Sequence, residues 1–484
     1  MTNPLLELQR LGQSPWHDNI RRGLLTSGAL ARMVADGDIT GLTSNPTIFE
    51  QAIESGTDYQ AQLRTLARAR KRPAEIFDAL AISDIRDAAD VFAPVYRRTE
   101  GGDGFVSIEV NPVYANDTAK TISEAHRLWG AVDRPNLMVK IPATREGVPA
   151  IEECIAAGLN INITLIFALT RYDEVMEAYL AGIARRVAAG KPVHNVSSVA
   201  SFFVSRVDTE VDKRLDALIA AAAPEMVEHL KALQGRSAIA NAKLASHEFR
   251  EKFGTPRFAE LARHGARLQR PLWASTSTKN PAYPDVYYVE ALIGPDTVDT
   301  MPPATIVAYK DHGHPAVRID RDVDDARAIL QRLASAGVSM DDVTHKLEID
   351  GVAAFAKSYE SLLATVEKAA AAAASESRHA AKARPKKAAP ARREARAAKR
   401  PAKRKTRAKA TKSRTRSTAG RRTKAAGRSK ATATRRRTRS RARNGAGARR
   451  TPRSGAGRAR ATAKKPRRST RKTPRTRATR RRTR

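Results

Sequence analysis

The sequence has a single cysteine, few aromatic residues and no long apolar run. Cys154 is the one cysteine among 484 residues, so no disulfide can form within the chain. This fits a reducing compartment. No apolar run approaches the roughly 20 residues of a membrane-spanning helix, and the first residues lack the basic and apolar regions of a signal peptide. We therefore expect a cytoplasmic protein without a membrane partner, whose oligomeric state the sequence leaves open.

Aromatic residues and acidic charge are both missing from the last part of the chain. Residues 371–484 contain no Phe, Trp or Tyr, and they hold 46 of the 88 Lys and Arg residues but 2 of the 50 Asp and Glu residues, a net charge of +44. The remaining 42 basic and 48 acidic residues leave residues 1–370 with a net charge of −6. A segment so charged and so poor in apolar side chains cannot offset the entropy of ordering its backbone. We predict a folded domain over residues 1–370 and a disordered basic tail over residues 371–484.

Short apolar runs alternate with helical patterns through the folded domain. Pro149 and Gly158 suit the start and end of one helix, and residues 169–187 carry a helical apolar stripe. Strands that are apolar on both faces and alternate with helices indicate a parallel sheet covered by helices. The strand candidates are residues 39–43, 104–110, 137–141, 161–167, 196–204 and 272–275, with weaker ones at 286–289 and 305–308.

About eight such strands predict an α/β protein built as a single closed (β/α)8 TIM barrel, for which the domain is long enough. A doubly wound open sheet is the alternative. No G-x-G-x-x-G pattern follows the first strand, which removes the usual argument for a dinucleotide site.

Lys140 lies inside the apolar run Leu137–Ile141. Burial disfavours the charged ammonium group, so such a lysine is either paired with a carboxylate or shifted toward the neutral amine. A neutral amine at the end of a strand can attack a carbonyl group and form a Schiff base. Taken alone, a lysine that is paired or that reaches solvent along its stem is the commoner case.

Polar residues follow or end the predicted strands, where a barrel of this kind carries its chemistry. Each has an ordinary structural explanation, such as a turn or a salt bridge, but consecutive strands would bring them together. Glu109, on the strand before Lys140, can move the protons that Schiff-base formation requires. Amides and hydroxyls suit a polyhydroxy substrate, and Arg206 and Lys279 suit its phosphate. The remaining candidates are Asn45, Asn162, Thr164, Ser201 and Ser275. Metal-ligand spacing and phosphate-binding loop motifs are both missing, so we expect no cofactor.

Two segments resemble the transaldolases. Thr43-Ser44-Asn45-Pro46 is similar to the family's T-[ST]-N-P signature, and Met138–Thr144, followed by Asn162–Phe167, is similar to its active-site signature. The resemblance covers residues 1–367 and is to the longer actinobacterial and cyanobacterial members. It implies a TIM barrel that transfers a dihydroxyacetone unit between sugar phosphates in the pentose phosphate pathway, without a cofactor.

The resemblance also implies roles for single residues. Lys140 would form the Schiff base, Glu109 would act through a water, and Asp18 would take and return the proton at carbon–carbon cleavage. Asn45, Asn162, Thr164 and Ser201 would bind the substrate or the water, and Arg206 would bind phosphate. In residues 274–280, two residues longer than the usual pattern, Lys279 replaces a second arginine beyond Ser275. A lysine cannot make the bidentate contact of arginine. The residues around Asp18 also differ from those of shorter members.

The basic tail resembles the Ala/Lys/Arg-rich tails of linker-histone-like and nucleoid proteins in composition. Its charge should bind polyanions through counterion release, without reading sequence. The lack of aromatic residues argues against stacking on single-stranded bases. A solvated extension is the plain alternative. Two other functions also stay open: a class I aldolase that releases the three-carbon unit, and a nucleic-acid-associated protein whose barrel has lost catalysis.

Overall fold

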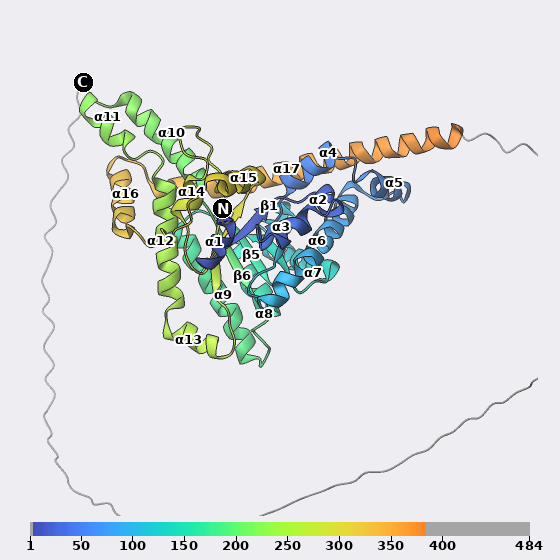
Figure 1. Ribbon diagram of the computed structural model, residues 1–484, viewed down its shortest axis with the longest axis horizontal. Coiled ribbons are helices and arrows are strands. Elements are labelled where there is room, and N and C mark those ends of the chain that lie inside the picture. Colours follow the sequence, from blue (N-terminus) through green and yellow to red (C-terminus); the bar gives the residue numbers. More distant parts are fainter. Residues whose placement is uncertain (1–2, 384–484) are drawn as a thin grey trace, which may run out of the picture. The chain divides into compact units, whose positions relative to one another are not determined.

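Eight parallel strands close into a barrel in the computed structural model, which describes residues 3–383, with side chains to residue 373 (Figure 1). The strands follow one another around the barrel in chain order, and the first pairs with the last. The strands are β1 (Gln13–Asp18), β2 (Gly41–Thr43), β3 (Val106–Glu109), β4 (Leu137–Pro142), β5 (Ile161–Ile166), β6 (Ser198–Phe203), β7 (Gln269–Ala274) and β8 (Thr297–Met301). The predicted TIM barrel is confirmed, and the open sheet is excluded.

Six of the predicted strands are present, but the last two candidates were wrong. Val286 precedes a short helix to which residues 287–289 belong, and residues 305–308 lie inside a helix that Pro303 begins. The apolar residues there bury one helix face, at Ile306 and Tyr309, and do not alternate as in a strand.

The missing strands are β1 and β8, which sequence reasoning did not find. Their sequences, Gln-Ser-Pro-Trp-His-Asp and Thr-Val-Asp-Thr-Met, are too polar to stand out. Gln13, His17, Asp299 and Thr300 are nevertheless buried. Because neighbouring side chains of a strand face alternately the barrel interior and the surrounding helices, both faces of these strands are buried once the barrel closes, and hydropathy gives no warning of a strand with buried polar residues.

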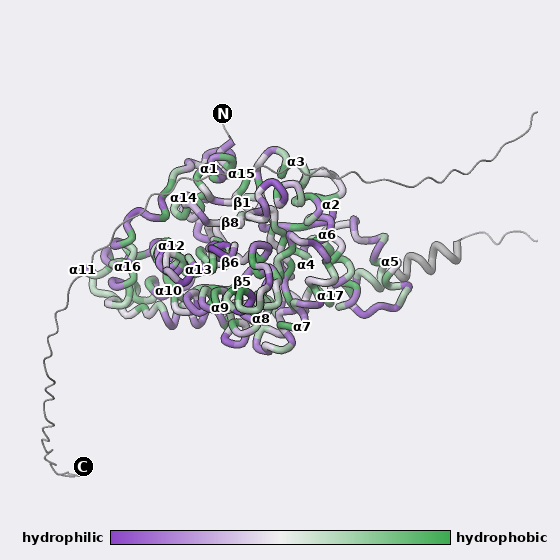
Figure 2. The backbone as a smooth tube through the Cα atoms, turned by 90° about the horizontal axis from the view of Figure 1, so that it is seen from below, coloured by the Kyte–Doolittle hydropathy of each residue, from purple (hydrophilic) through white to green (hydrophobic). Residues whose placement is uncertain are grey.

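Helices surround the strands, and their apolar and polar stretches alternate along the chain (Figure 2). The stripe predicted for residues 169–187 is buried, and Gly158 ends its helix in the left-handed conformation, as expected. The helices are α1 (Pro4–Arg10), α2 (Arg22–Thr26), α3 (Ala29–Ala35), α4 (Pro46–Ser55), α5 (Gln60–Arg68), α6 (Pro73–Arg98), α7 (Thr118–Val132), α8 (Gly147–Ala157), α9 (Leu169–Ala188), α10 (Ser205–Ala221), α11 (Pro224–Lys231), α12 (Ser237–Phe253), α13 (Pro256–Arg263), α14 (Tyr287–Ala291), α15 (Pro303–His312), α16 (Val323–Ser335) and α17 (Met340–Ala383), with a 3-10 turn at Pro112–Tyr114.

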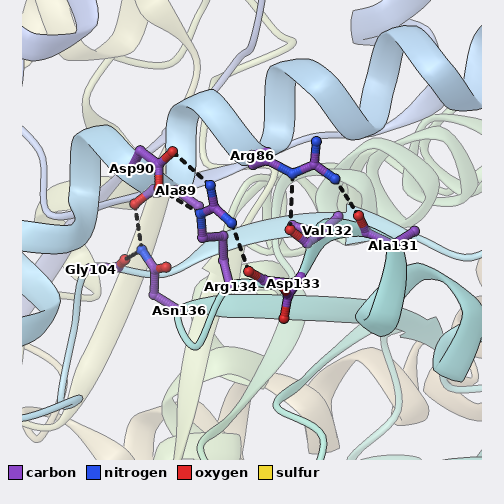
Figure 3. Close-up of polar contacts among 9 residues, drawn as sticks. All are labelled: Arg86, Ala89, Asp90, Gly104, Ala131, Val132, Asp133, Arg134 and Asn136. Atoms are coloured by element: carbon purple, nitrogen blue, oxygen red, sulfur yellow. Dashed lines mark hydrogen bonds and ion pairs between the residues drawn. The ribbon is translucent and has the colours of Figure 1, made fainter.

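Hydrogen bonds and an ion pair connect the segments around the amino-terminal ends of β3 and β4 (Figure 3). The Asn136 amide donates to the carbonyl oxygens of Ala89 at 2.9 Å and Gly104 at 2.8 Å. Arg134 forms a two-pronged ion pair with Asp90 on α6. The Asn136 and Arg134 bonds connect the loop before β4 to α6, and Asn136 also reaches Gly104, two residues before β3, at the end of the barrel opposite the predicted site.

The long helix α17 returns to the barrel from the end of the folded domain. It packs against α4, α5, α6 and α10 and reaches β5. The predicted boundary at residue 370 falls within this helix, which continues to Ala383. The prediction that the basic tail is disordered therefore concerns mainly residues 384–484, which lie outside the described residues. Within the described part, none of the helices is long and apolar enough to cross a membrane.

Candidate active site

Three predicted site residues occupy matching positions on consecutive strands. Glu109 on β3 pairs in register with Lys140 on β4, and Lys140 pairs with Asn162 on β5. Side chains at paired positions of parallel strands point to the same face. All three therefore meet inside the barrel near the carboxyl ends of the strands, where only 5% of Lys140 is exposed.

Lys140 is paired, not free. Its Nζ lies 3.7 Å from Oε2 of Glu109 and donates a hydrogen bond of 3.1 Å to the backbone oxygen of Ser44. Oε2 of Glu109 is buried and accepts no hydrogen bond from the described residues. Burial raises the pKa of Glu109 to about 7, although Lys140 opposes the shift. Glu109 can therefore exchange a proton with a neighbouring group near neutral pH.

Asp18 faces the same space from the end of β1. The Thr43 hydroxyl donates to Oδ1 of Asp18 at 2.8 Å and lies 2.7 Å from the hydroxyl of Thr300. Burial raises the pKa of Asp18, while the charge of Lys140 and the Thr43 hydrogen bond act in the opposite direction. The carboxyl group is thus held by the Thr43 hydroxyl on β2, which in turn contacts the Thr300 hydroxyl on β8.

A chain of hydrogen bonds orients Asn162. The Ser201 hydroxyl donates to Oδ1 of Asn162 at 2.7 Å, and Nδ2 of Asn162 donates to the Ser107 hydroxyl at 3.1 Å. Thr164 differs, because its buried hydroxyl has no hydrogen-bond partner among the described residues. A buried hydroxyl without a partner is costly in free energy. Thr164 is thus available to a ligand, whereas Asn162 and Ser201 are already engaged.

Most of the predicted site residues line one cavity, which has a volume of about 190 Å³. Of the predicted residues, Asp18, Asn45, Lys140, Thr164, Arg206, Ser275 and Lys279 line it. The other lining residues, which sequence reasoning missed as site residues, are Thr43, Phe203, Ala274, Ser277, Thr300, Pro302 and Phe355. Glu109, Asn162 and Ser201 are not in its wall. Glu109 contacts Lys140 from the neighbouring strand, and Asn162 and Ser201 hold each other.

Two cations lie in the wall of the cavity. The Arg206 guanidinium, in the first turn of α10, lies over the Phe203 ring at 5.2 Å from the ring centre. Nζ of Lys279 donates to the Ser277 hydroxyl at 2.7 Å. Burial lowers the pKa of both groups, and the Arg206 charge further lowers that of Lys279. Each cation would therefore gain from an anion between them.

Backbone conformation also shapes the site at two residues that are not glycine. Leu165 has a φ of 61°, where the register between β5 and β6 shifts, and Ser275 has a φ of 59°. The Ser275 hydroxyl lies 2.9 Å from that of Ser205. Left-handed backbone at such residues costs about 1–3 kcal/mol and tends to gather at functional sites.

The family model described as transaldolase/fructose-6-phosphate aldolase matches residues 15–366. The chain belongs to this family. The resemblance seen in its motifs is thereby confirmed, and the match ends inside α17, before the basic tail.

Individual relatives within the transaldolase family are similar over nearly their whole length. A transaldolase of Frankia alni is 48% identical over 367 residues, which cover 76% of this chain and 97% of the relative. One of Thermobifida fusca is 49% identical over 364 residues, covering 75% and 97%. One of Trichodesmium erythraeum is 44% identical over 370 residues, covering 76% and 97%.

Of the missed lining residues, only Thr43 could have been found from the sequence. It stands in the Thr43-Ser44-Asn45-Pro46 motif, and its neighbour Ser44 contributes a backbone oxygen that no side-chain pattern reveals. Thr300 belongs to the undetected strand β8, and Phe355 comes from α17. Both reach the cavity only because distant parts of the chain fold over it.

Replacing Glu109 should change how stability depends on pH. The pKa of Glu109 is about 7 in the folded chain and about 4.3 in an unfolded chain. The carboxyl therefore contributes stability below about pH 4.3 that is lost as pH rises through about 7. In Glu109→Gln the free energy of unfolding, relative to that of the original chain, should rise between pH 4.5 and 8 by on the order of 3 kcal/mol, and the difference in melting temperature should rise with it.

Glu54→Gln, at an exposed position of α4, controls for the loss of one acidic side chain. A difference in melting temperature between Glu109→Gln and the original chain that stays constant across this pH range would contradict the buried environment described for Glu109.

Proposed function

We propose that the chain is a transaldolase that works through a Schiff base on Lys140. It transfers a dihydroxyacetone unit from sedoheptulose 7-phosphate to glyceraldehyde 3-phosphate, which yields erythrose 4-phosphate and fructose 6-phosphate in the pentose phosphate pathway. The observation that carries this proposal is the buried Lys140 beside Glu109, in a cavity that also holds Asp18 and two cations. The transaldolase relatives that the chain matches over nearly their full length support it.

Formation of the Schiff base needs an amine and a proton carrier. The neutral Lys140 amine attacks the ketose carbonyl carbon, and the resulting carbinolamine loses water to form the imine. Glu109, with a pKa of about 7, gives a proton to the departing hydroxyl and can take it back. Oε2 of Glu109 accepts no hydrogen bond from the described residues, so it can accept one from a water that bridges it to Lys140.

Cleavage needs a base on the far side of the bound sugar. We assign this role to Asp18, which takes the proton of the C4 hydroxyl while the electrons of the C3–C4 bond move into the imine. The aldose leaves, and a three-carbon enamine stays on Lys140. The next aldose phosphate accepts the enamine, and Asp18 returns the proton. Thr43 holds the carboxyl group in place for both steps.

The remaining predicted residues divide between the sugar chain and its phosphate. We assign the sugar hydroxyls to Thr164, Asn45 and Ser275. Oδ1 of Asn45 caps α4 at 3.0 Å, so its amide NH₂ is the group left for substrate. Asn162 and Ser201, which hydrogen-bond to each other, support these three residues from the barrel interior. The phosphate goes to Arg206 and Lys279, with Lys279 contributing a point charge where an arginine would make a fork.

Replacing Lys140 should abolish turnover without unfolding the barrel. Lys140→Ala removes the only amine that this mechanism uses, so the rate should fall by at least about 10⁴-fold, in line with the loss of a covalent catalyst. Borohydride reduction in the presence of fructose 6-phosphate should fix a three-carbon or six-carbon adduct on Lys140, located by peptide mass spectrometry. Lys279→Ala is the matched control, because it should weaken binding but still be trapped. An adduct on another lysine would overturn the assignment.

Phe355 should influence whether the enamine is transferred or released. Its side chain, 8% exposed, closes the cavity from α17. Removing it would admit water, which protonates the enamine and releases dihydroxyacetone, as an aldolase does. In Phe355→Ala, the ratio of dihydroxyacetone release (measured without an acceptor) to transfer (measured with one) should rise about threefold, a shift of about 0.7 kcal/mol. Ile349→Ala, at an exposed position of the same helix, serves as control. An unchanged ratio would remove Phe355 from this role.

A second proposal concerns the basic tail. We place its boundary with the folded domain near residue 370, and we place the protein in the cytoplasm. We propose that residues 371–484 bind nucleic acid or another polyanion non-specifically, independent of catalysis. Its net charge of +44 supports this. The full chain should bind duplex DNA of any sequence, and its affinity should fall at least about a hundredfold between 50 and 200 mM salt. A chain ending at residue 383 should lose this binding and keep its turnover. Equal binding by both chains would place the nucleic-acid contact elsewhere.

A further inference from the structure

The cation Lys279 lies in the β7–α14 loop, residues 275–286, which forms neither a helix nor a strand. In the middle of this loop, the hydrogen bonds that residues 277–282 form with described residues all stay within residues 277–283. Lys279 itself donates to the nearby Ser277 hydroxyl. No hydrogen bond to another described element holds this stretch in place. The position of Lys279 therefore depends on how the two ends of the stretch are held.

The first end of the loop is bound to the start of α10. The Ser275 hydroxyl lies 2.9 Å from that of Ser205, and the Ser205 N–H donates to the Ser275 carbonyl oxygen at 3.1 Å. The next residue, Thr276, donates its hydroxyl to the buried Asp299 on β8 at 2.9 Å. Arg206 directly follows Ser205 in α10. This end of the loop is thus fixed relative to the helix that carries the other cation.

The second end of the stretch is bound to the same helix. The Tyr283 hydroxyl donates to Oδ2 of Asp212 at 2.7 Å. Asp212 follows Arg206 by six residues in α10, which is fewer than two helical turns. Lys279 lies midway in sequence between Ser275 and Tyr283. Both ends of the stretch that carries Lys279 are therefore bound to the helix that carries Arg206.

The surroundings of Asp212 are shaped to receive the Tyr283 ring. Oδ1 of Asp212 accepts a hydrogen bond from the Gly235 N–H at 2.9 Å, so both carboxylate oxygens are engaged. Gly235 has a φ of 69°, and a Cβ atom there would lie 2.6 Å from Cζ of Tyr283. A glycine at this position lets the ring approach the backbone closely. On its other side the ring packs against Tyr287, with 5.8 Å between the ring centres.

Electrostatic repulsion gives the bond to Asp212 a purpose. Burial and the charge of Arg206 both lower the pKa of Lys279, while Asp18 acts in the opposite direction. The repulsion from Arg206 favours a Lys279 side chain that turns away into water. The bond between Tyr283 and Asp212 limits this movement, because it holds the end of the loop that lies away from β7. A site held ready in this way loses less affinity to the ordering of its own groups.

We propose that Tyr283 and Asp212 are positioning residues, which hold Lys279 opposite Arg206 before the phosphate of the substrate arrives. The inference rests on the proposed function, in which these two cations bind that phosphate. Neither Tyr283 nor Asp212 lines the active-site cavity. They act through Lys279 and not by contact with the substrate.

Tyr283→Phe keeps the ring and removes only the hydroxyl that reaches Asp212. In the full chain, the KM for fructose 6-phosphate should rise at least about fivefold with kcat within about twofold, because phosphate binding weakens while the chemistry is unchanged. In a Lys279→Ala background the same change should raise KM by less than about 1.5-fold, since the group to be positioned is missing. Tyr287→Phe is the matched control. It removes a hydroxyl that donates to the Gly235 carbonyl at 3.0 Å, and its KM should stay within about twofold.

Hydrogen exchange separates failure of this inference from failure of the proposed function. Inorganic phosphate should slow exchange of the backbone amides of residues 276–282 in the original chain, and clearly less in Tyr283→Phe. This measurement needs no turnover, and it reads these residues alone, so phosphate bound to the basic tail does not contribute.

A chain that shows this protection but no turnover would support the inference and contradict the proposed function. Turnover with an equal KM in Tyr283→Phe and the original chain would overturn the inference, as would an equal rise in KM in the Lys279→Ala background. Absence of phosphate protection in the original chain would overturn it too.

Discussion

The buried pair formed by Lys140 and Glu109 is the constraint on which the arrangement at the carboxyl-terminal end of the barrel depends. Two ionisable groups leave water together, and such a pair stabilises a protein only when close geometry and further hydrogen bonds compensate. Here the compensation is sparse, with a separation of 3.7 Å and one hydrogen bond, from Lys140 to Ser44. Glu109 has a raised pKa as a result. The pair is thus poorly arranged for stability and well arranged for moving protons.

Closure of the barrel explains how this pair acquires its neighbours. Parallel strands in matching register bring Glu109, Lys140 and Asn162 into one row. The pairing of β1 with β2 and β8 adds Asp18, its partner Thr43 and, beside Thr43, Thr300. The same alternation of side chains repeats one layer below, where Trp16 and Met138 lie two positions before Asp18 and Lys140 on the same strands. One geometric rule therefore stacks the polar layer of the site on a largely apolar layer of the barrel interior.

Sequence reasoning succeeded where local pattern and local structure agree. The run around Lys140 is apolar and forms β4, and the helix ending at Gly158 has its expected cap. It failed for β8, because the buried polar residues Asp299 and Thr300 give no sign of a strand in the sequence. It also failed for residues 305–308, whose β-branched residues suggest a strand but form part of α15, so context outweighed the local preference there.

The sequence by itself determined the chemistry that the chain carries: a lysine in an apolar run, a carboxylate on the strand before it, and a basic segment set apart from a mildly acidic domain. Only the tertiary structure decided which groups meet. Thr300 reaches Thr43 because the last strand closes on the first, and Phe355 enters the cavity because α17 returns over the barrel. Composition and spacing describe a chain locally, whereas these contacts depend on long-range closure, which residues near in sequence do not encode.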